Sequence, residues 1–338
     1  MMKQANLRLV ASLGLLLAVT AAVVFATFDA QMFIYLRALR LWAVLLVLGL
    51  VATGLYFDAY RLKRMAELAG TAVTLKQCVP VILGNYFFAL LTPGATGGPV
   101  AQVALLRKAG VPVGKATVLA VVRTLLSLFV LVLCLPVVVY LDDGIAAWLP
   151  KHLAVGAAMA VVAAGCGMLK LMQVRRFALL FKRVACRLLP GKARQLLRFF
   201  RDLEAALTLL GQSGRGMAEA FVYTVFSLFA LYSIVPVLFA GMGAPVAWGT
   251  VLGRVVLLNF VLYFAPTPGG AGVAEGGFVL LFSTLYPASM VGIAALLWRL
   301  FSEYLPFMLG FIAMVRVFGY HFLKNSQLLA ADEGGKCG

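Results

Sequence analysis

Long apolar runs dominate the chain, and short polar stretches separate them. Each run is long enough to cross a hydrocarbon layer of about 30 Å at about 1.5 Å per helical residue. The runs lie at residues 9–28, 39–57, 116–140, 153–171, 217–239 and 289–315. The pattern therefore predicts about six membrane-spanning helices.

Two further apolar stretches are interrupted by glycine and proline. Val79–Leu91 runs into the glycine- and proline-rich residues 92–99, and only a short apolar piece follows before the next basic residues. Neither piece reaches across the membrane, so we predict a re-entrant hairpin over 77–107 that begins and ends in the cytoplasm. Residues 246–286 repeat this arrangement around Pro266–Gly272. They predict a second hairpin that enters from the external side or, as an alternative, a pair of full spans.

The composition agrees with a membrane protein. Hydrophobic residues make up 63% of the 338 positions and charged residues 12%, against about 45–50% and about 25% in soluble domains. A compact soluble fold could not cover so much apolar surface, which excludes a soluble enzyme, a disordered chain and a disulfide-stapled secreted domain. The five cysteines are scattered without a metal-site spacing. We therefore predict an all-α, polytopic membrane helical bundle without a metal or cofactor.

Basic residues outnumber acidic residues, 29 to 12. In a membrane protein this excess indicates cytoplasmic loops rather than nucleic-acid binding. With both termini in the cytoplasm, 23 of the 29 basic residues fall in cytoplasmic segments, and residues 58–76 with Arg61 are predicted to be one of them. Residues 173–216 combine basic residues with apolar ones at helical spacing. This segment is either an amphipathic connector on anionic headgroups or an ordinary positively charged loop.

The two interrupted stretches resemble each other in detail. P-G-A-T-G at 93–97 and P-G-G-A-G at 268–272 share the pattern P-G-x-x-G. An asparagine precedes each proline, a polar side chain follows each glycine turn, and a lone arginine lies in the next span. Each half reads span, span, hairpin, span with opposite orientation, which predicts an inverted repeat typical of secondary transporters. The predicted units are a first repeat at 1–150, a second repeat at 151–320 and a cytoplasmic tail at 321–338.

These paired motifs carry the candidate chemistry. A half-helix that starts after glycines presents free N–H groups and a positive dipole end, which attract anions. With the arginines of the following spans, two such turns predict a cationic pocket at midplane depth that suits an anionic phospholipid headgroup or a polyprenyl phosphate. The predicted binding residues are Asn85, Pro93, Gly94, Gly97, Gly98, Gln102, Arg123, Asn259, Pro268, Gly269, Gly270, Gly272, Glu275, Arg299 and Glu303.

Structural interpretations stay open for several of these residues. Arg123 lies near the start of its span, where its side chain could reach the interface. Arg299 could form a structural ion pair with Glu303 or with Glu275. The amide side chains could hydrogen-bond within the bundle. Arg254 is expected at the external interface, and titration of the two glutamates would permit proton coupling.

The residues around both motifs resemble a known family. Three stretches are similar to the first signature of the lysylphosphatidylglycerol-synthase transmembrane-domain family, also called flippase-like. They are N-x7-P-G-A-T-G-G-P-V from Asn85, L-R-K-A-G-V-P-V-G-K-A from Leu106 and V-V-R ending at Arg123. Three further stretches are similar to the second signature of that family: L-N at 258–259, P-T-P-G-G-A-G-V-A-E from 266 and W-R at 298–299. The resemblance covers nearly the whole chain. It implies an integral inner-membrane protein that flips or handles lipids.

The resemblance also implies differences from the larger members of that family. Those members carry a soluble aminoacyl-transferase domain after the membrane part and make and flip lysyl-phosphatidylglycerol. This chain stops shortly after its last predicted span, so we expect no synthase activity. Many members have an acidic residue soon after the first Gly-Gly, where this chain has Pro99 and Gln102.

The leading functional hypothesis is therefore a lipid flippase or transporter rather than an enzyme. One alternative is a membrane-embedded lipid-modifying transferase. Another is a non-catalytic membrane partner that anchors an enzyme of lipid or cell-envelope biosynthesis through residues 173–216. The expected ligands are membrane lipids, the expected location is the bacterial cytoplasmic membrane, and a homo-oligomer stays open. The lipid, the transport direction and the energy source do not follow from the sequence.

Overall fold

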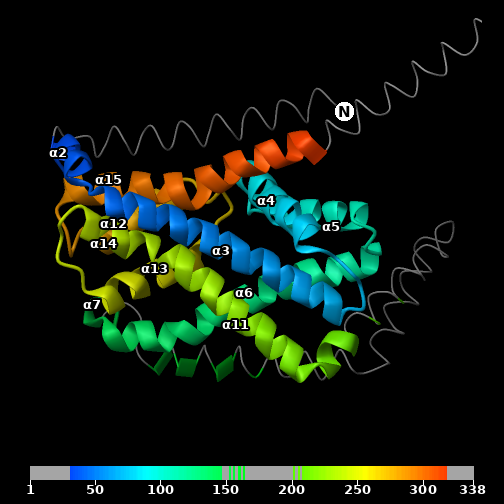
Figure 1. The fold of residues 1–338 in the computed structure, drawn as a ribbon. Coiled ribbons are helices and arrows are strands. Elements are labelled where there is room, and N and C mark those ends of the chain that lie inside the picture. The colour runs from blue at the N-terminus through cyan, green and yellow to red at the C-terminus, as the bar shows by residue number, and fades with distance from the viewer. Residues whose placement is uncertain are drawn as a thin grey trace, which may run out of the picture.

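The computed structural model describes residues 31–146 and 208–317, together with isolated positions between 152 and 205. All regular elements in these ranges are helices, and they form an elongated bundle (Figure 1). Several predicted segments lie outside the described residues. They are the span 9–28, most of the span 153–171, most of the connector 173–216 and the tail 321–338.

Four helices in the described ranges are long and apolar enough to cross a membrane. They are Leu41–Leu68, Val113–Leu141, Gly214–Gly241 and Ala288–Val317. Each overlaps one of the predicted spans, so four of the spans expected from the apolar runs are confirmed as helices of spanning length. Large apolar side chains such as Leu45, Phe229 and Leu280 are exposed on the outer faces of the bundle, as lipid-facing positions require.

Two of these long helices change their geometry midway. The third one consists of α11 (Gly214–Tyr232) and α12 (Ile234–Gly241), which meet at Ser233. Pro236 lacks an N–H donor, which interrupts the helical hydrogen bonds at this point. The fourth one begins as α15 (Ala288–Arg299), passes through the π-helical turn η2 (Leu300–Tyr304), and continues as an α-helix over 305–317.

Helix α3 (Leu41–Leu68) extends well beyond its predicted span. Residues 58–76, which the sequence predicts to be cytoplasmic, begin within this helix, which continues to Leu68. Arg61 is not exposed to solvent as a residue of a cytoplasmic segment would be, because only 2% of it is accessible. The helix can continue because Asp58 lies one turn before Arg61 and pairs with it inside the bundle.

Both interrupted stretches form helical hairpins. The first consists of α4 (Leu75–Leu91) and α5 (Gly97–Lys108), and the second of α13 (Trp248–Leu262) and α14 (Val273–Phe282). The first hairpin packs on α3 and α6 (Val113–Leu141), while α13 packs on α6 and α14 packs on α15. Figure 1 shows the two hairpins at opposite ends of the bundle, so that their turns point toward its middle.

Two short helices and two hydrophobic cores complete the described fold. The short helices are α2 (Gln31–Ala38), which packs on α15, and α7 (Asp143–Ala146), which follows α6. One core surrounds the second hairpin and includes Phe239, Phe278 and Trp298. The other surrounds the first hairpin and includes Leu62 and Leu106. Each hairpin is therefore held by its own core rather than by lipid.

Candidate functional site

The tips of the two hairpins meet inside the bundle. Pro93 and Pro268, the first residues of the two P-G-x-x-G motifs, pair as an isolated antiparallel β-bridge. Next to them Leu90 and Ala271 are buried together and pack against Tyr304. The motifs lie far apart in the sequence, yet their backbones are in direct contact. Pro268 is buried, whereas Pro93 and residues 94–96 of the first turn are exposed.

The first turn satisfies its own backbone. The N–H of Gly97 donates to Thr92 Oγ1 at 2.7 Å, and that hydroxyl donates to the carbonyl of Phe88 at 2.9 Å. A Cβ at Gly97 would lie 2.6 Å from the Thr92 side chain, so the threonine cap requires glycine there. The N–H group that was expected to attract an anion at this half-helix therefore already has a partner.

The second turn is capped in a similar way. Gly272 has a φ of +83°, which favours glycine, and its N–H donates to Glu275 Oε2 at 2.8 Å. A carboxylate in the first turn also interacts favourably with the positive end of the helix dipole. At the start of each half-helix, one backbone N–H thus has a side-chain partner, Thr92 in the first hairpin and Glu275 in the second.

Arg299 lies directly against the second turn. Its guanidinium donates to the Gly269 carbonyl at 2.9 Å and to Glu275 Oε1 at 3.0 Å, and it forms an ion pair with Glu303 at 2.7 Å. Arg299 is only 1% exposed. The π-helical turn that follows it carries Glu303, and such turns are frequent at functional sites. We call these four residues the Arg299 cluster. Arg299 therefore pairs with both of the glutamates that the sequence offers as its partners.

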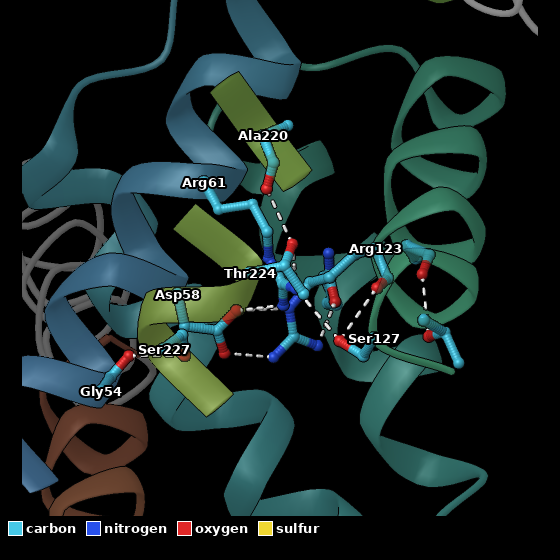
Figure 2. Close-up of polar contacts among 11 residues, drawn as sticks. Gly54, Asp58, Arg61, Arg123, Ser127, Ala220, Thr224 and Ser227 are labelled. Carbon is cyan, nitrogen blue, oxygen red and sulfur yellow. Dashed lines mark hydrogen bonds and ion pairs between the residues drawn. The ribbon is translucent and has the colours of Figure 1, made fainter. Parts of the chain in front are cut away.

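A second charged cluster is buried among α3, α6 and α11 (Figure 2). The carboxylate of Asp58 accepts hydrogen bonds from Arg61 and, with both of its oxygens, from Arg123. Arg61 also donates to the hydroxyls of Ser127 and Thr224, each at 3.0 Å. The three charged groups connect α3 with α6, and the hydroxyl of Thr224 adds a contact from α11. Removing one partner of such a buried pair typically costs about 3–5 kcal/mol.

The first hairpin contributes one more side chain to this cluster. Gln102 on α5 is 1% exposed, and its Oε1 accepts a hydrogen bond from Arg123 at 3.4 Å. Tyr263, which follows α13 at the tip of the second hairpin, lies against Ser127 and within electrostatic reach of Arg123. Both hairpins thus reach this group of residues. The Asp58 cluster is defined as Asp58, Arg61, Gln102, Arg123, Ser127 and Thr224.

The two clusters lie at different depths. One end of the bundle carries exposed or half-exposed basic residues on successive helices, and we call it the basic end. These residues are Lys63, Arg64, Lys108, Lys115 and Arg215. Asp58, Gln102 and Thr224 lie five residues, and Arg123 eight residues, inward from the nearest charged residue of the basic end on their helices, or about 7–12 Å at the α-helical rise. Arg61 lies only two residues from Lys63.

The paired turns lie deeper. Gly97 is eleven residues from Lys108 along α5, or about 16 Å, close to half of a hydrocarbon layer of about 30 Å. Arg299 is likewise eleven residues, or about 16 Å, from the start of α15 at the other end. Arg123 pairs with Asp58, and Arg299 pairs with Glu275 and Glu303, so the two arginines belong to separate ion-pair networks. That both arginines line one pocket stays a prediction.

Arg254, which the sequence predicts at the external interface, is buried within the protein. It is 6% exposed, and its Nε donates to Asp142 Oδ2 at 2.6 Å, while Nη1 donates to Thr284 at 2.6 Å. Asp142 follows the end of α6, and its hydrogen bond from Arg254 lowers its pKa below the ordinary value. The charge can be buried here because this carboxylate neutralises it. The pair fastens α13 to the end of α6, away from the basic end.

The remaining predicted residues have local structural contacts. A Cβ at Gly98 would lie 2.8 Å from Asn85 Oδ1, so this asparagine sits at the crossing of α4 and α5. Asn259 donates to the carbonyl of Val255 in its own helix at 2.9 Å, which is the backbone-bonding interpretation. Gly94 and Gly270 adopt positive φ angles within the turns. These positions shape the turns rather than supply charge.

Sequence reasoning missed Asp58, Arg61, Ser127 and Thr224. The available signal was an i,i+3 acidic and basic pair, Asp58 and Arg61, at the end of an apolar run. Within residues 31–146 and 208–317, no group of three or more His, Cys, Asp or Glu side chains could hold a metal ion. The buried charges of the described part are therefore arranged as arginine–carboxylate networks.

Comparison with known proteins agrees with these features. The family profile described as "Lysylphosphatidylglycerol synthase TM region" matches residues 7–310. The chain belongs to this family. It is also 22% identical over 300 residues to a UPF0104 membrane protein from Archaeoglobus fulgidus, covering 84% of this chain and 88% of that protein. Both hairpins and both arginine clusters lie within the matched region. The protein is thus a membrane protein of the lysylphosphatidylglycerol synthase transmembrane-region family.

Proposed function

We propose that the protein translocates a lipid with an anionic or phosphate-containing headgroup across the bacterial cytoplasmic membrane. The observation that carries the proposal is the contact between Pro93 and Pro268, where two hairpins from opposite ends of the bundle meet beside the buried Arg299. Helix breaks of this kind lie at the substrate sites of many transporters. A headgroup could move along the charged interior while its acyl chains stay in lipid.

An inverted repeat is part of this proposal. In the first half, Arg123 of α6 contacts Gln102 of α5. In the second half, Arg299 of α15 contacts Glu275 of α14. The two arginines follow their hairpin prolines by nearly the same number of residues, and each contacts the polar residue just after its own turn. This correspondence supports two halves of related structure, with opposite membrane orientation.

The proposed orientation follows from charge. The basic end carries side chains from α3, α5, α6 and α11, and basic residues collect on the cytoplasmic side of membrane proteins. We therefore place this end in the cytoplasm. The first hairpin then enters from the cytoplasm and the second from the external side. The Asp58 cluster lies closer to the inner leaflet, and the paired turns lie near the middle of the membrane.

Lipid movement in proteoliposomes tests the proposal. The purified protein is reconstituted with a trace of fluorescent phosphatidylglycerol, and the fraction of probe accessible to an added quencher is followed with time. We expect wild-type protein to make the inner-leaflet probe accessible, and we expect Arg123→Ala and Arg299→Ala to abolish this movement. Each variant removes positive charge that faces the proposed path.

Arg254→Ala is the matched control, because it also breaks a buried arginine–carboxylate pair but lies outside both clusters. It should lose stability while the reconstituted folded fraction keeps moving lipid. Wild-type rates in both Arg123→Ala and Arg299→Ala would refute the proposed path, and equal loss in Arg254→Ala would show that any buried ion pair has the same effect.

A further inference from the structure

We propose that the Asp58 cluster is a binding site for a monoanionic phosphodiester, the group that links glycerol to the headgroup in phospholipids. The inference rests on the proposed function and narrows it, because it names the chemical group that is recognised and the residues that recognise it. It assigns Arg61 and Gln102 as phosphate-binding residues, with Asp58 as the carboxylate that neutralises the arginines when no phosphate is bound.

Charge balance is the first argument. Arg61 and Arg123 share a single carboxylate, Asp58, so the cluster carries one excess positive charge. In the described ranges the other acidic side chains that form ion pairs have other partners. These pairs are Glu67 with Lys63 and Arg64, Glu219 with Arg64 and Arg215, Asp142 with Arg254, and Glu275 and Glu303 with Arg299. One phosphodiester carries the single negative charge that would balance the cluster, while a dianion would overcompensate it.

Unpartnered donors are the second argument. Arg61 Nε and Gln102 Nε2 are buried and have no hydrogen-bond partner among the described residues. Their residues are 2% and 1% exposed. A buried donor without an acceptor costs about 1–3 kcal/mol, and more when the group is charged. Because Gln102 Oε1 accepts from Arg123, the free amide nitrogen on the same group also lies beside the cluster. Phosphate oxygens are suitable acceptors for both donors.

The geometry around Asp58 is the third argument. Its two oxygens accept hydrogen bonds from two guanidinium groups on different helices, and Arg123 binds both oxygens at once. Arginine recognises carboxylate and phosphate oxygens with the same paired donors. The arginines are therefore already arranged for an oxyanion, and hydroxyls of Ser127 and Thr224 hold Arg61 in position. An incoming phosphodiester can take over part of the hydrogen bonding that Asp58 provides.

The depth of the cluster fits a lipid phosphate that leaves the headgroup layer. Asp58 and Arg123, the ion pair at its centre, lie about 7–12 Å inward from the nearest charged residues of the basic end on their helices, before the paired turns. A phospholipid of that leaflet needs to sink by only this distance to place its phosphate between Arg61 and Arg123. The site is therefore the positively charged group closest to the basic end, whereas Arg299 at the turns already has two carboxylate partners.

Two substitutions with opposite expected effects test the site. Arg61→Met leaves one arginine paired with one carboxylate. This removes the excess positive charge and leaves no buried charge unbalanced. The affinity for a phosphodiester should therefore weaken about tenfold or more. Asp58→Asn raises the excess charge by one and removes the competing carboxylate, so binding should tighten. Gln102→Met removes one donor with little change in volume and should weaken binding even if Asp58→Asn does not fold.

The measurement is the thermal unfolding midpoint in a zwitterionic detergent, titrated with dimethyl phosphate or with short-chain phosphatidylglycerol. Arg64→Met is the matched control, since Arg64 lies one turn from Arg61 but pairs with Glu219 at the half-exposed surface. It removes the same charge and should bind like wild type. Stabilisation by both probes shows that the phosphodiester suffices, and stabilisation by phosphatidylglycerol alone shows that the acyl chains are needed as well.

The proposal is overturned if neither probe stabilises the wild-type protein, or if Arg61→Met and Gln102→Met respond to both probes as wild type does. The liposome assay separates this result from failure of the proposed function. Wild-type lipid movement together with unchanged binding by Arg61→Met rejects the site and leaves translocation standing. Binding that depends on Arg61 without any lipid movement keeps the site and rejects translocation.

Discussion

Gly310 allows the last membrane-spanning helix to touch the first hairpin, and adding one methyl group there should separate them. A Cβ at this position would lie 2.4 Å from the Leu83 carbonyl oxygen of α4 and 2.9 Å from Phe87 Cβ. Real Cβ atoms essentially never approach closer than 3.0 Å, so the backbones must move apart by at least the missing 0.6 Å. A backbone carbonyl cannot rotate away as a flexible side chain can.

The expected cost follows from two opposing effects. Overpacking a close contact costs about 1–3 kcal/mol. Alanine is favoured over glycine in a helix by about 0.5–1 kcal/mol, which offsets part of this cost. We therefore expect Gly310→Ala to lower the free energy of unfolding by about 1–2 kcal/mol. Phe87 of α4 and Phe307 stack across the same helix–helix contact, with ring centroids 4.9 Å apart. Separation of the two helices should therefore also weaken this stacking.

Unfolding in mixed micelles, followed by helicity during titration with sodium dodecyl sulfate, measures this change. Gly49→Ala is the control, because Gly49 lies inside helix α3 and a Cβ there would meet no atom within 4 Å. Its helix should become more stable by about 0.5–1 kcal/mol. The packing argument fails if Gly310→Ala is as stable as the wild-type protein, or if both substitutions shift stability in the same direction.

Two further predictions concern the ends and the centre of the fold. Because Arg254 lowers the pKa of Asp142, their pair stabilises the folded protein above the ordinary carboxyl pKa of 3.8, and this contribution is lost as the pH falls through the lowered value. Asp142→Asn should flatten that acid limb in a plot of unfolding midpoint against pH; an unchanged limb would contradict the assignment. At the centre, antiparallel bridge residues have Cα atoms about 4.5–5.5 Å apart, which is within disulfide range. Pro93→Cys with Pro268→Cys, on a cysteine-free background, should form a crosslink on mild oxidation, and persistent labelling of both thiols by a maleimide would argue against contact between the turns.

The arginines illustrate how far the sequence could lead. An arginine inside a long apolar run is costly unless it is paired, so Arg123 and Arg299 could be recognised as buried and constrained from the sequence alone. The partner of Arg299 could also be narrowed to Glu275 and Glu303, because one lies a helical turn away and the other follows the nearby glycine turn. The partner of Arg123 could not, because Asp58 comes from a helix 65 residues earlier in the chain.

Arg61 and Arg254 show why local pattern was insufficient. Both lie near the ends of apolar runs, where a basic residue usually reaches water, and the sequence therefore predicted exposure. In the folded protein Arg254 is buried against Asp142 at the end of α6, and Arg61 is buried against Asp58 of its own helix and the hydroxyls of Ser127 and Thr224 from two other helices. Burial of a charge depends on whether a counter-charge reaches it, and that depends on how the helices pack.

The length of the apolar runs and the recurrence of P-G-x-x-G determined the membrane class, four of the spans and the two hairpins. Both features act locally along the chain, because the hydrocarbon layer sets the length of a span and proline and glycine interrupt a helix where they occur. Only the tertiary structure decided that the two turns touch and that the arginines divide between two clusters at different depths. Those outcomes depend on contacts between helices far apart in the sequence, where a shift of a few ångströms changes which carboxylate neutralises which guanidinium.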